Sequence, residues 1–351
     1  MIKFLYASIF TICFFAASCS KKTNNDIKEI SIDFDKIESL DLSNGNEINL
    51  EFSDSSIIRR IDELRLYNKT HYFIRSGSDL LLFDDKGFFK NQIGQKGNGP
   101  MEFTHFNSFF VRKDTVFIYD AMSKRIILYD LNGKYLKYEL LKDTYTDITP
   151  NYIFPIAQNK FISKNTYGGD NRKIPSYSIL DENYKVISNL KNRYLKDGIT
   201  SLNNFFSDNN SVLFWELLND SLFSVTNDTT YSPKYFINFH EKSLPKSIRK
   251  LDLYDAIELT NKPDNKQKYA SLIRCVYEDL NYLRFIFLYN GEVYYVKSDK
   301  NKDYVKTYKF HYNNGEIVPI IYFEDNKLVI PVSSFEDEGN PTLVIIDERL
   351  L

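Results

Sequence analysis

The chain has 351 residues, 43% of them hydrophobic, with 45 Lys and Arg against 47 Asp and Glu. The apolar fraction excludes a disordered or collagen-like chain, and a formal net charge of −2 gives no long-range field for capturing nucleic acid or an anionic bilayer. The 26 Tyr and 28 Phe favour a large β protein, because aromatic rings fit half-buried pleated surfaces.

The N-terminal residues have the features of a secretory signal peptide. Lys3 supplies a positive charge, residues 4–17 are uncharged and apolar, and small residues precede Cys19. A helix of residues 4–17 would rise only about 21 Å, short of the roughly 30 Å hydrocarbon core of a bilayer. Small residues before a cysteine resemble a bacterial lipobox. This implies a signal peptide over 1–18, a lipid on Cys19 and a tether over 19–27; the alternative is an ordinary signal peptide with a chance cysteine.

These expectations change the cysteine count. If Cys13 leaves with the signal and Cys19 carries a lipid, Cys275 is the one remaining thiol of the mature chain, so we expect no intramolecular disulfide. Cys275 lies in the apolar run 272–276, which predicts a buried structural thiol rather than a nucleophile.

An internal repeat runs along the rest of the chain. The segment LFDDKGFF at 82–89 recurs as LYDLNGKY at 128–135, and both patterns indicate a β-hairpin with a D-x-x-G turn. Four of the five intervals between equivalent positions are 43 to 51 residues, the period of four-stranded propeller blades. Six equivalents predict one all-β domain over 28–351, a six-bladed β-propeller with four-stranded antiparallel blades; they are Asp84, Asp130, Asp181, Ser224, Lys297 and Asp347.

Two segments stand outside the repeat. Ile248, Leu251, Tyr254 and Ile257 recur every three residues and predict one helix in an insertion at about 243–268, between blades four and five. The sixth blade lacks an outermost strand after residues 342–346. We expect the alternating segment 30–34 to supply it, so that an N-terminal strand closes the last blade.

The segment QIGQKGNGPMEF at 92–103 follows the first hairpin. It resembles the I-G-x-x-G-x-G-P-G-E-F/Y signature of the six-bladed β-propeller lipoproteins of Bacteroides-type bacteria, which are similar to NHL-repeat propellers. The lipobox, the F-D-x-x-G turn, YLRF at 282–285 and GNP at 339–341 fit the same family, whereas Met101 stands where the family usually has Gly. The resemblance implies a propeller in the cell envelope, facing the periplasm or the cell surface, and assigns no activity.

The sequence contains no catalytic or cofactor motif that we recognise. The G-x-x-G-x-G spacing of 94–99 is neither a dinucleotide fingerprint nor a P-loop, and predicts a turn between blades. The four His are scattered, and neither a D-x-D-x-D-G loop nor G-x-S-x-G occurs. Trp215 lies in an apolar strand and is predicted to be core. We therefore expect no cofactor, no metal and no nucleic-acid partner.

Propeller geometry narrows the search for a ligand site. Blade-to-blade connections and second-to-third strand turns share one face, here called the loop face, and the D-x-x-G turns lie on the other, the turn face. Binding residues concentrate in loops on a rigid scaffold. We expect a ligand at the channel mouth of the loop face, and predict a structural role for the D-x-x-G turns. The candidate ligand-binding residues are Arg75, Lys96, His105, Arg125, Tyr167, Arg172, Asp337 and Glu338.

Three functions remain open. The leading hypothesis is a lipid-anchored envelope propeller that binds a glycan, a peptide or an envelope protein. The alternative is a carbohydrate-active hydrolase or lyase whose site forms only on folding, and two carboxylates about 5–9.5 Å apart would favour it. A structural spacer is the third. Propellers host both binding and catalysis, so the fold does not choose.

Overall fold

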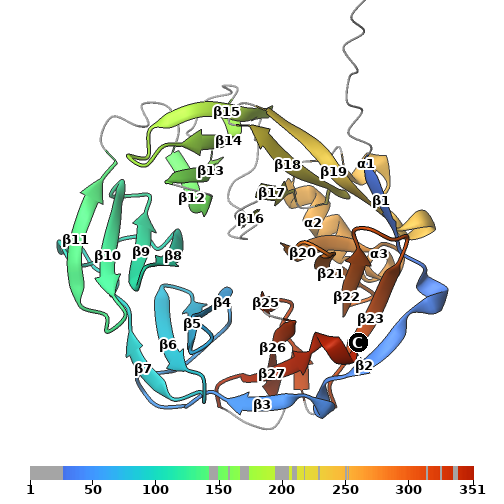
Figure 1. The fold of residues 1–351 in the computed structure, drawn as a ribbon, viewed down its shortest axis with the longest axis horizontal. Helices are drawn as coiled ribbons and strands as arrows, with labels where there is room; N and C mark the ends of the chain where they lie inside the picture. The colour runs from blue at the N-terminus through green and yellow to red at the C-terminus, as the bar shows by residue number, and fades with distance from the viewer. Residues whose placement is uncertain are drawn as a thin grey trace, which may run out of the picture.

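The computed structural model describes residues 27–141, 149–156, 159–166, 174–193, 205–207, 212–216, 218–227, 230–249, 251, 253–313, 315–324, 326–334 and 339–351. These residues form six β-sheets set as blades around a central axis (Figure 1). The predicted six-bladed β-propeller is therefore confirmed. The predicted signal peptide and Cys19 lie outside the described residues. No helix within the described ranges is long and apolar enough to cross a membrane.

Blades one to three are four-stranded sheets of antiparallel neighbours, with strands that follow chain order outwards from the axis. Blade one contains β4 (Glu63–Tyr67), β5 (His71–Ser76), β6 (Asp79–Asp84) and β7 (Phe89–Gln92). Blade two contains β8 (Ser108–Arg112), β9 (Thr115–Asp120), β10 (Arg125–Asp130) and β11 (Tyr135–Leu140). Blade three contains β12 (Thr149–Ile156), β13 (Lys160–Thr166), β14 (Ile174–Leu180) and β15 (Val186–Arg193).

Blades four to six continue the ring. Blade four contains β16 (Phe205–Ser207), β17 (Val212–Trp215), β18 (Ser221–Asn227) and β19 (Thr230–Asn238). Blade five contains β20 (Ser271–Glu278), β21 (Tyr282–Tyr289), β22 (Glu292–Asp299) and β23 (Val305–His311). In blade six, β24 (Gly315–Ile317) and β25 (Tyr322–Glu324) both pair with β26 (Lys327–Ser334), which pairs with β27 (Thr342–Asp347).

The N-terminal chain runs around the outside of blades four, five and six (Figure 1). β1 (Lys28–Ser31) pairs in parallel with β19, and β2 (Glu38–Asp41) pairs in parallel with β23. β3 (Asn46–Asn49) pairs antiparallel with β27 and closes the last blade. Closure by an N-terminal strand is thus confirmed, but the choice of residues 30–34 as its donor was wrong. Ile30 and Ile32 are instead fully buried in the core that blades four and five share.

The repeated turn has a common hydrogen-bond pattern. Oδ1 of Asp84 accepts the backbone N–H groups two and four residues later, and Asp130 and Asp181 do the same at their own turns. Two of these turns place glycine three residues after the aspartate, and the third places Tyr184 there with φ of 61°. The carboxylate is therefore what makes the turn recur, since it satisfies donors that the tight backbone leaves unpaired.

Several aromatic residues pack between neighbouring blades. Trp215 is 2% exposed in the core of blades four and five, as predicted. Ring pairs cross the blade boundaries with centroids 4.6 to 6.2 Å apart, the range in which tilted and edge-on rings attract. They include Phe73–Phe109, Phe110–Phe161, Tyr177–Phe214, Phe206–Tyr277 and Tyr295–Phe323.

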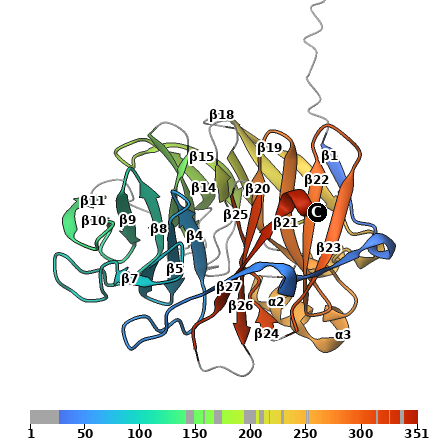
Figure 2. The same ribbon diagram turned by 60° about the horizontal axis from the view of Figure 1, so that its bottom comes forward.

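The insertion between blades four and five differs from the prediction of one continuous helix. It forms three short helices, α1 (Lys246–Arg249), α2 (Leu253–Asn261) and α3 (Pro263–Lys266). The Leu251 N–H bonds to the Ile248 carbonyl in a turn that ends α1. Arg249, at that end, donates to Leu244 O and to the Asp220 carboxylate, which ties the helix to blade four. Figure 2 shows α2 and α3 at the end of the ring opposite to the end that β1 and β22 reach.

Candidate functional site

Two of the predicted ligand residues on the loop face are held by backbone carbonyls. Arg75, 9% exposed at the end of β5, donates to the carbonyls of Phe106 and Asn107 at 2.7 Å each. Arg125, at the start of β10, donates to the carbonyls of Gly99 at 3.2 Å and Glu102 at 2.5 Å. Both guanidinium groups thus fix the chain segment that connects blade one to blade two.

The other predicted residues divide into two groups. Lys96 and His105 are exposed on the same connection, between β7 and β8, which is the blade-to-blade turn that the sequence predicted. Within this turn Glu102 Oε2 accepts the Gly99 N–H at 2.8 Å. Tyr167, Arg172, Asp337 and Glu338 lie outside the residues whose side chains the structure describes. Ligand binding at the loop face therefore stays a prediction.

A polar pocket lies on the turn face, between blades five and six. Asp279 follows β20 and Asn326 precedes β26, so both occupy first-to-second strand turns, and Glu348 directly follows β27. These positions place the pocket opposite to the face that we predicted. Its volume is about 210 Å³, and its walls are formed by Tyr277, Asp279, Arg284, Phe323, Asn326, Lys327 and Glu348.

The floor of the pocket is a buried ion pair. Arg284 and Glu348 have side chains only 3% and 2% exposed, and Arg284 Nε donates to the Glu348 carboxylate oxygens at 2.6 and 2.8 Å. The Tyr295 hydroxyl donates to the same carboxylate. Arg284 Nη1 donates to Asp279 Oδ2 at 2.5 Å. One guanidinium group thus joins the two carboxylates that line the pocket.

The protonation states follow from these bonds. Burial raises the pKa of Asp279, but hydrogen bonds from Arg284 and from the N–H groups of Tyr282 and Asn281 outweigh burial and hold that pKa below its usual value. Burial lowers the pKa of Arg284, and the hydrogen bonds to Glu348 and Asp279 raise it by more. At neutral pH Asp279 is therefore ionised and Arg284 is a cation.

A row of cations crosses blade five beside the pocket. Arg284 on β21, Lys297 on β22 and Lys306 on β23 are neighbours in register, so their side chains leave the same side of the sheet. Lys297 Nζ donates to the Glu348 carbonyl at 3.1 Å, and Lys306 Nζ to the Leu351 carbonyl at 3.5 Å. Burial first, and then the charges of Arg284 and Lys306, lower the pKa of Lys297.

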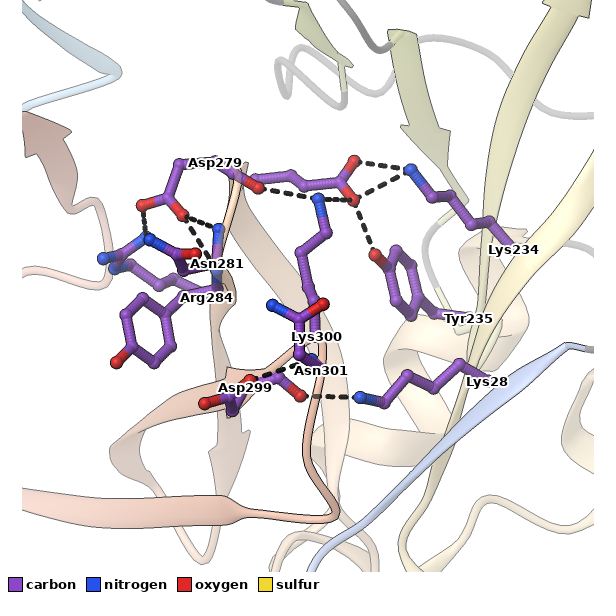
Figure 3. Close-up of polar contacts among 11 residues, drawn as sticks. Lys28, Lys234, Tyr235, Asp279, Asn281, Arg284, Asp299, Lys300 and Asn301 are labelled. Atoms are coloured by element: carbon purple, nitrogen blue, oxygen red, sulfur yellow. Dashed lines mark hydrogen bonds and ion pairs between the residues drawn. The ribbon is translucent and has the colours of Figure 1, made fainter.

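The turn that carries Asp279 is also held from blade four (Figure 3). The Glu278 carboxylate, 1% exposed, accepts from Lys234 Nζ at 2.8 and 2.9 Å, from the Tyr235 hydroxyl at 2.5 Å and from Lys300 Nζ at 3.0 Å. Lys300 Nζ also donates to the Asp279 carbonyl at 2.7 Å. The β20–β21 turn is therefore fixed from blade four on one side and from blade six on the other.

Two further predictions concern chemistry outside the pocket. Across the described ranges, no three His, Cys, Asp or Glu side chains are grouped so that they could hold a metal ion.

Cys275 Sγ accepts the Ile321 N–H at 3.2 Å, and burial raises the pKa of its thiol to about 11. At neutral pH this thiol is protonated, which fits the structural role that the sequence predicted.

Sequence reasoning missed the pocket, although a signal was present. Lys297 stands at a repeat position where Asp84, Asp130 and Asp347 carry the opposite charge. This reversal marked blade five as different from the other blades. The residue that faces it, Glu348, could not be identified because the two are 51 positions apart.

Comparisons with known proteins agree with this fold. Residues 34–341 match the sequence model of a family described as a domain of unknown function, DUF4934. The structure is similar to that of a Bacteroides fragilis protein described as exported, with a TM-score of 0.68 and 18% identity, covering 91% of this chain and 99% of that one. It is also similar to a DUF4221 family member from Bacteroides vulgatus, with a TM-score of 0.55 and 10% identity, covering 86% and 96%. No curated protein matches the chain.

Proposed function

The chain belongs to the DUF4934 family, and we propose that it is an exported, lipid-anchored β-propeller that binds a small ligand in the pocket between blades five and six. The lipobox-like sequence before Cys19 supports the anchor, and the similar Bacteroides fragilis protein described as exported supports the location. The observation that carries the binding proposal is the pocket itself, whose floor is the buried pair of Arg284 and Glu348.

Hydrogen bonds within the protein hold the walls of the pocket in place. Its β20–β21 turn is bonded to Lys234 of blade four and, through Arg284, to Glu348 of blade six. Side chains held in this way lose little conformational freedom when a ligand binds, so more of the contact energy remains as affinity. Rigid polar groups beside two aromatic rings are typical of small-molecule sites.

Binding fits this site better than glycoside hydrolysis does. Hydrolysis requires one carboxyl group that is protonated near neutral pH, held so by a raised pKa. The pKa of Asp279 is lowered instead, and both lining carboxylates already accept hydrogen bonds from Arg284. These bonds would have to break before either group could act on a sugar.

The loop face remains a second place for a ligand. Lys96 and His105 are exposed there, whereas Arg75 and Arg125 are occupied by backbone carbonyls. A ligand at the loop face would therefore meet Lys96 and His105 first, and a Lys96→Ala/His105→Ala double variant separates this site from the pocket.

A glycan and peptide binding screen of the full-length protein in detergent tests the proposal. Lys327→Trp fills the mouth of the pocket, and Lys302→Trp makes the same change at an exposed lysine outside it. We expect a ligand that binds the wild type and the Lys302→Trp variant but not Lys327→Trp. Binding that survives Lys327→Trp and is lost in the Lys96→Ala/His105→Ala variant would move the site to the loop face. A screen without any ligand would contradict the binding function.

A further inference from the structure

We propose that the pocket between blades five and six takes a small organic anion, whose carboxylate or phosphate group is bound by Arg284, Asn326 and Lys327. This inference rests on the proposed binding function and names the chemical class of its ligand. It follows from which hydrogen-bonding groups in the pocket already have partners.

The carboxylate oxygens that line the pocket each accept at least one hydrogen bond within the protein. Asp279 Oδ1 accepts the N–H groups of Asn281 at 2.7 Å and Tyr282 at 2.8 Å, and Oδ2 accepts Arg284 Nη1. Both oxygens of Glu348 accept Arg284 Nε. A ligand that offers hydrogen-bond donors would therefore find the lining carboxylates of these two residues already bonded.

Several hydrogen-bond donors in the pocket have no partner. Arg284 carries five N–H groups, and only Nε and Nη1 have partners among the described residues, so Nη2 is unpaired although the residue is 3% exposed. Nζ of Lys327 has no hydrogen-bond partner within the described ranges, and neither does the side-chain amide of Asn326, which offers an acceptor oxygen as well as N–H donors. Three unpaired donors from two blades thus line one cavity, and two of them are cationic.

The charges beside the pocket favour the same class of ligand. Among the lining residues Asp279 and Glu348 are anionic and Arg284 and Lys327 are cationic, and one further cation, Lys297, and one further anion, Asp347, lie beside them. Lys297 Nζ donates to a backbone carbonyl and lies 4.9 Å from the centroid of the Tyr282 ring. Both lining carboxylates are bonded to Arg284, so the charged groups that keep free N–H donors are the two lining cations, and a guanidinium fork suits carboxylate and phosphate groups.

The size and walls of the pocket limit the rest of the ligand. A volume of about 210 Å³ is that of roughly seven water molecules, which leaves room for an acidic group and a small ring or short chain. The rings of Tyr277 and Phe323, with centroids 5.9 Å apart, supply an apolar wall. The ligand is therefore a small anion with an apolar part rather than an inorganic ion or a polymer of anions.

Fluorine NMR of four small aromatic molecules tests this inference with the full-length protein in a non-ionic detergent. The anions are 4-fluorobenzoate and 4-fluorophenyl phosphate, and the controls are neutral 4-fluorobenzamide and cationic 4-fluorobenzylamine. We expect saturable binding of at least one anion, at least tenfold tighter than that of either control. Whichever anion binds identifies the acidic group.

The variants place the binding in the pocket. Lys327→Glu reverses a charge at an exposed lining position and should weaken anion binding at least tenfold. Asn326→Gly removes the amide and tolerates the φ of 62° at this position, so it should weaken binding without loss of the fold. Lys302→Glu, with the same charge change outside the pocket, should leave the affinity within twofold.

Three outcomes would overturn the inference, and they separate it from the proposed function. Equal binding of all four molecules, or preferred binding of the amine, with sensitivity to Lys327→Trp would keep a ligand pocket and exclude the anion. Anion binding that Lys327→Glu leaves unchanged would place the anion elsewhere. If none of the four molecules binds and the screen finds no ligand sensitive to Lys327→Trp, both the anion and the pocket function are wrong.

Discussion

Arg284 and Glu348 form an ion pair at 2.6 Å with both side chains almost fully buried, although 64 positions separate them in the sequence. The pair joins the second strand of blade five to the end of β27 in blade six, which is the blade that β3 completes. The same ion pair thus forms the floor of the candidate pocket and holds blades five and six together.

We expect the buried Arg284–Glu348 ion pair to contribute strongly to the stability of the fold. Glu348→Gln removes the negative charge and leaves the Arg284 cation buried without its main partner, which costs about 3 kcal/mol of unfolding free energy. Urea denaturation measures this loss. Arg349→Gln breaks an exposed pair with Asp347 and serves as the control, with no measurable change expected. Equal stability of Glu348→Gln and the wild type would contradict the importance of the pair.

Asp120 predicts a dependence of stability on pH. Burial raises its pKa, but hydrogen bonds from Ser123 and Thr104 outweigh burial and leave the pKa below its usual value. A carboxyl group whose folded pKa is lowered stabilises the fold above its unfolded pKa of about 3.9, and this contribution is lost as the pH falls through the folded value.

The matching variant is Asp120→Asn. It should be less stable than the wild type at pH 7, and the difference should shrink as the pH falls below the unfolded pKa of about 3.9 and through the lower folded pKa. Thermal unfolding across this pH range measures the effect. A difference that stays constant from pH 7 to pH 2 would exclude a role for the charge of Asp120.

Gly87 lies in close contact with β3, the strand that closes the ring. Its φ is 88°, and a Cβ there would lie 2.3 Å from the carbonyl oxygen of Asn49, at the end of β3. Gly87→Ala should therefore lower the unfolding free energy by more than about 1 kcal/mol, through backbone strain and a clash with β3. Gly77→Ala is the matched control because φ is 65° but no atom lies within 4 Å of its Cβ. Equal losses in both variants would show that contact with β3 adds nothing.

If Cys19 carries a lipid, its removal should change whether the protein is found in the membrane fraction or in the soluble fraction, and should leave the fold unchanged. Cys19→Ala removes the proposed attachment point, so the processed protein should move from the membrane fraction to the soluble fraction after cell lysis. Immunoblotting of the two fractions measures this. A Cys19→Ala protein that stays in the membrane fraction would refute lipidation at this residue.

The fold could be predicted from the sequence because its signals are local. The D-x-x-G turn is held by one carboxylate within five residues, so Asp84 and Asp130 mark their blades without knowledge of distant contacts. The alternation of Ile30 and Ile32 correctly indicated a half-buried strand. It could not indicate which blade edge receives that strand, since pairing with β19 depends on the packed ring.

The candidate site could not be predicted in the same way. Arg284, Asn326 and Glu348 come from separate turns and strands of two blades, and no spacing between them is imposed by chemistry. Arg75 and Arg125 showed the converse problem: their predicted position on the loop face suggested ligand binding, but both donate to backbone carbonyls of the neighbouring connection. Only the folded chain distinguishes a free guanidinium from an occupied one.

The path of the N-terminal chain has a mechanical consequence. A force applied before Ile27 acts first on β1 and then on β2, which lie on blades four and five, whereas the ring is closed by β3 on blade six. β1 pairs in parallel with β19, the outer strand of blade four, and Lys28 Nζ donates to the Asp299 carbonyl at 2.6 Å. These are the bonds on which the force acts first. Tension at the N-terminal end of the described chain would therefore act on β1 and β2 before it reached β3, which closes the ring.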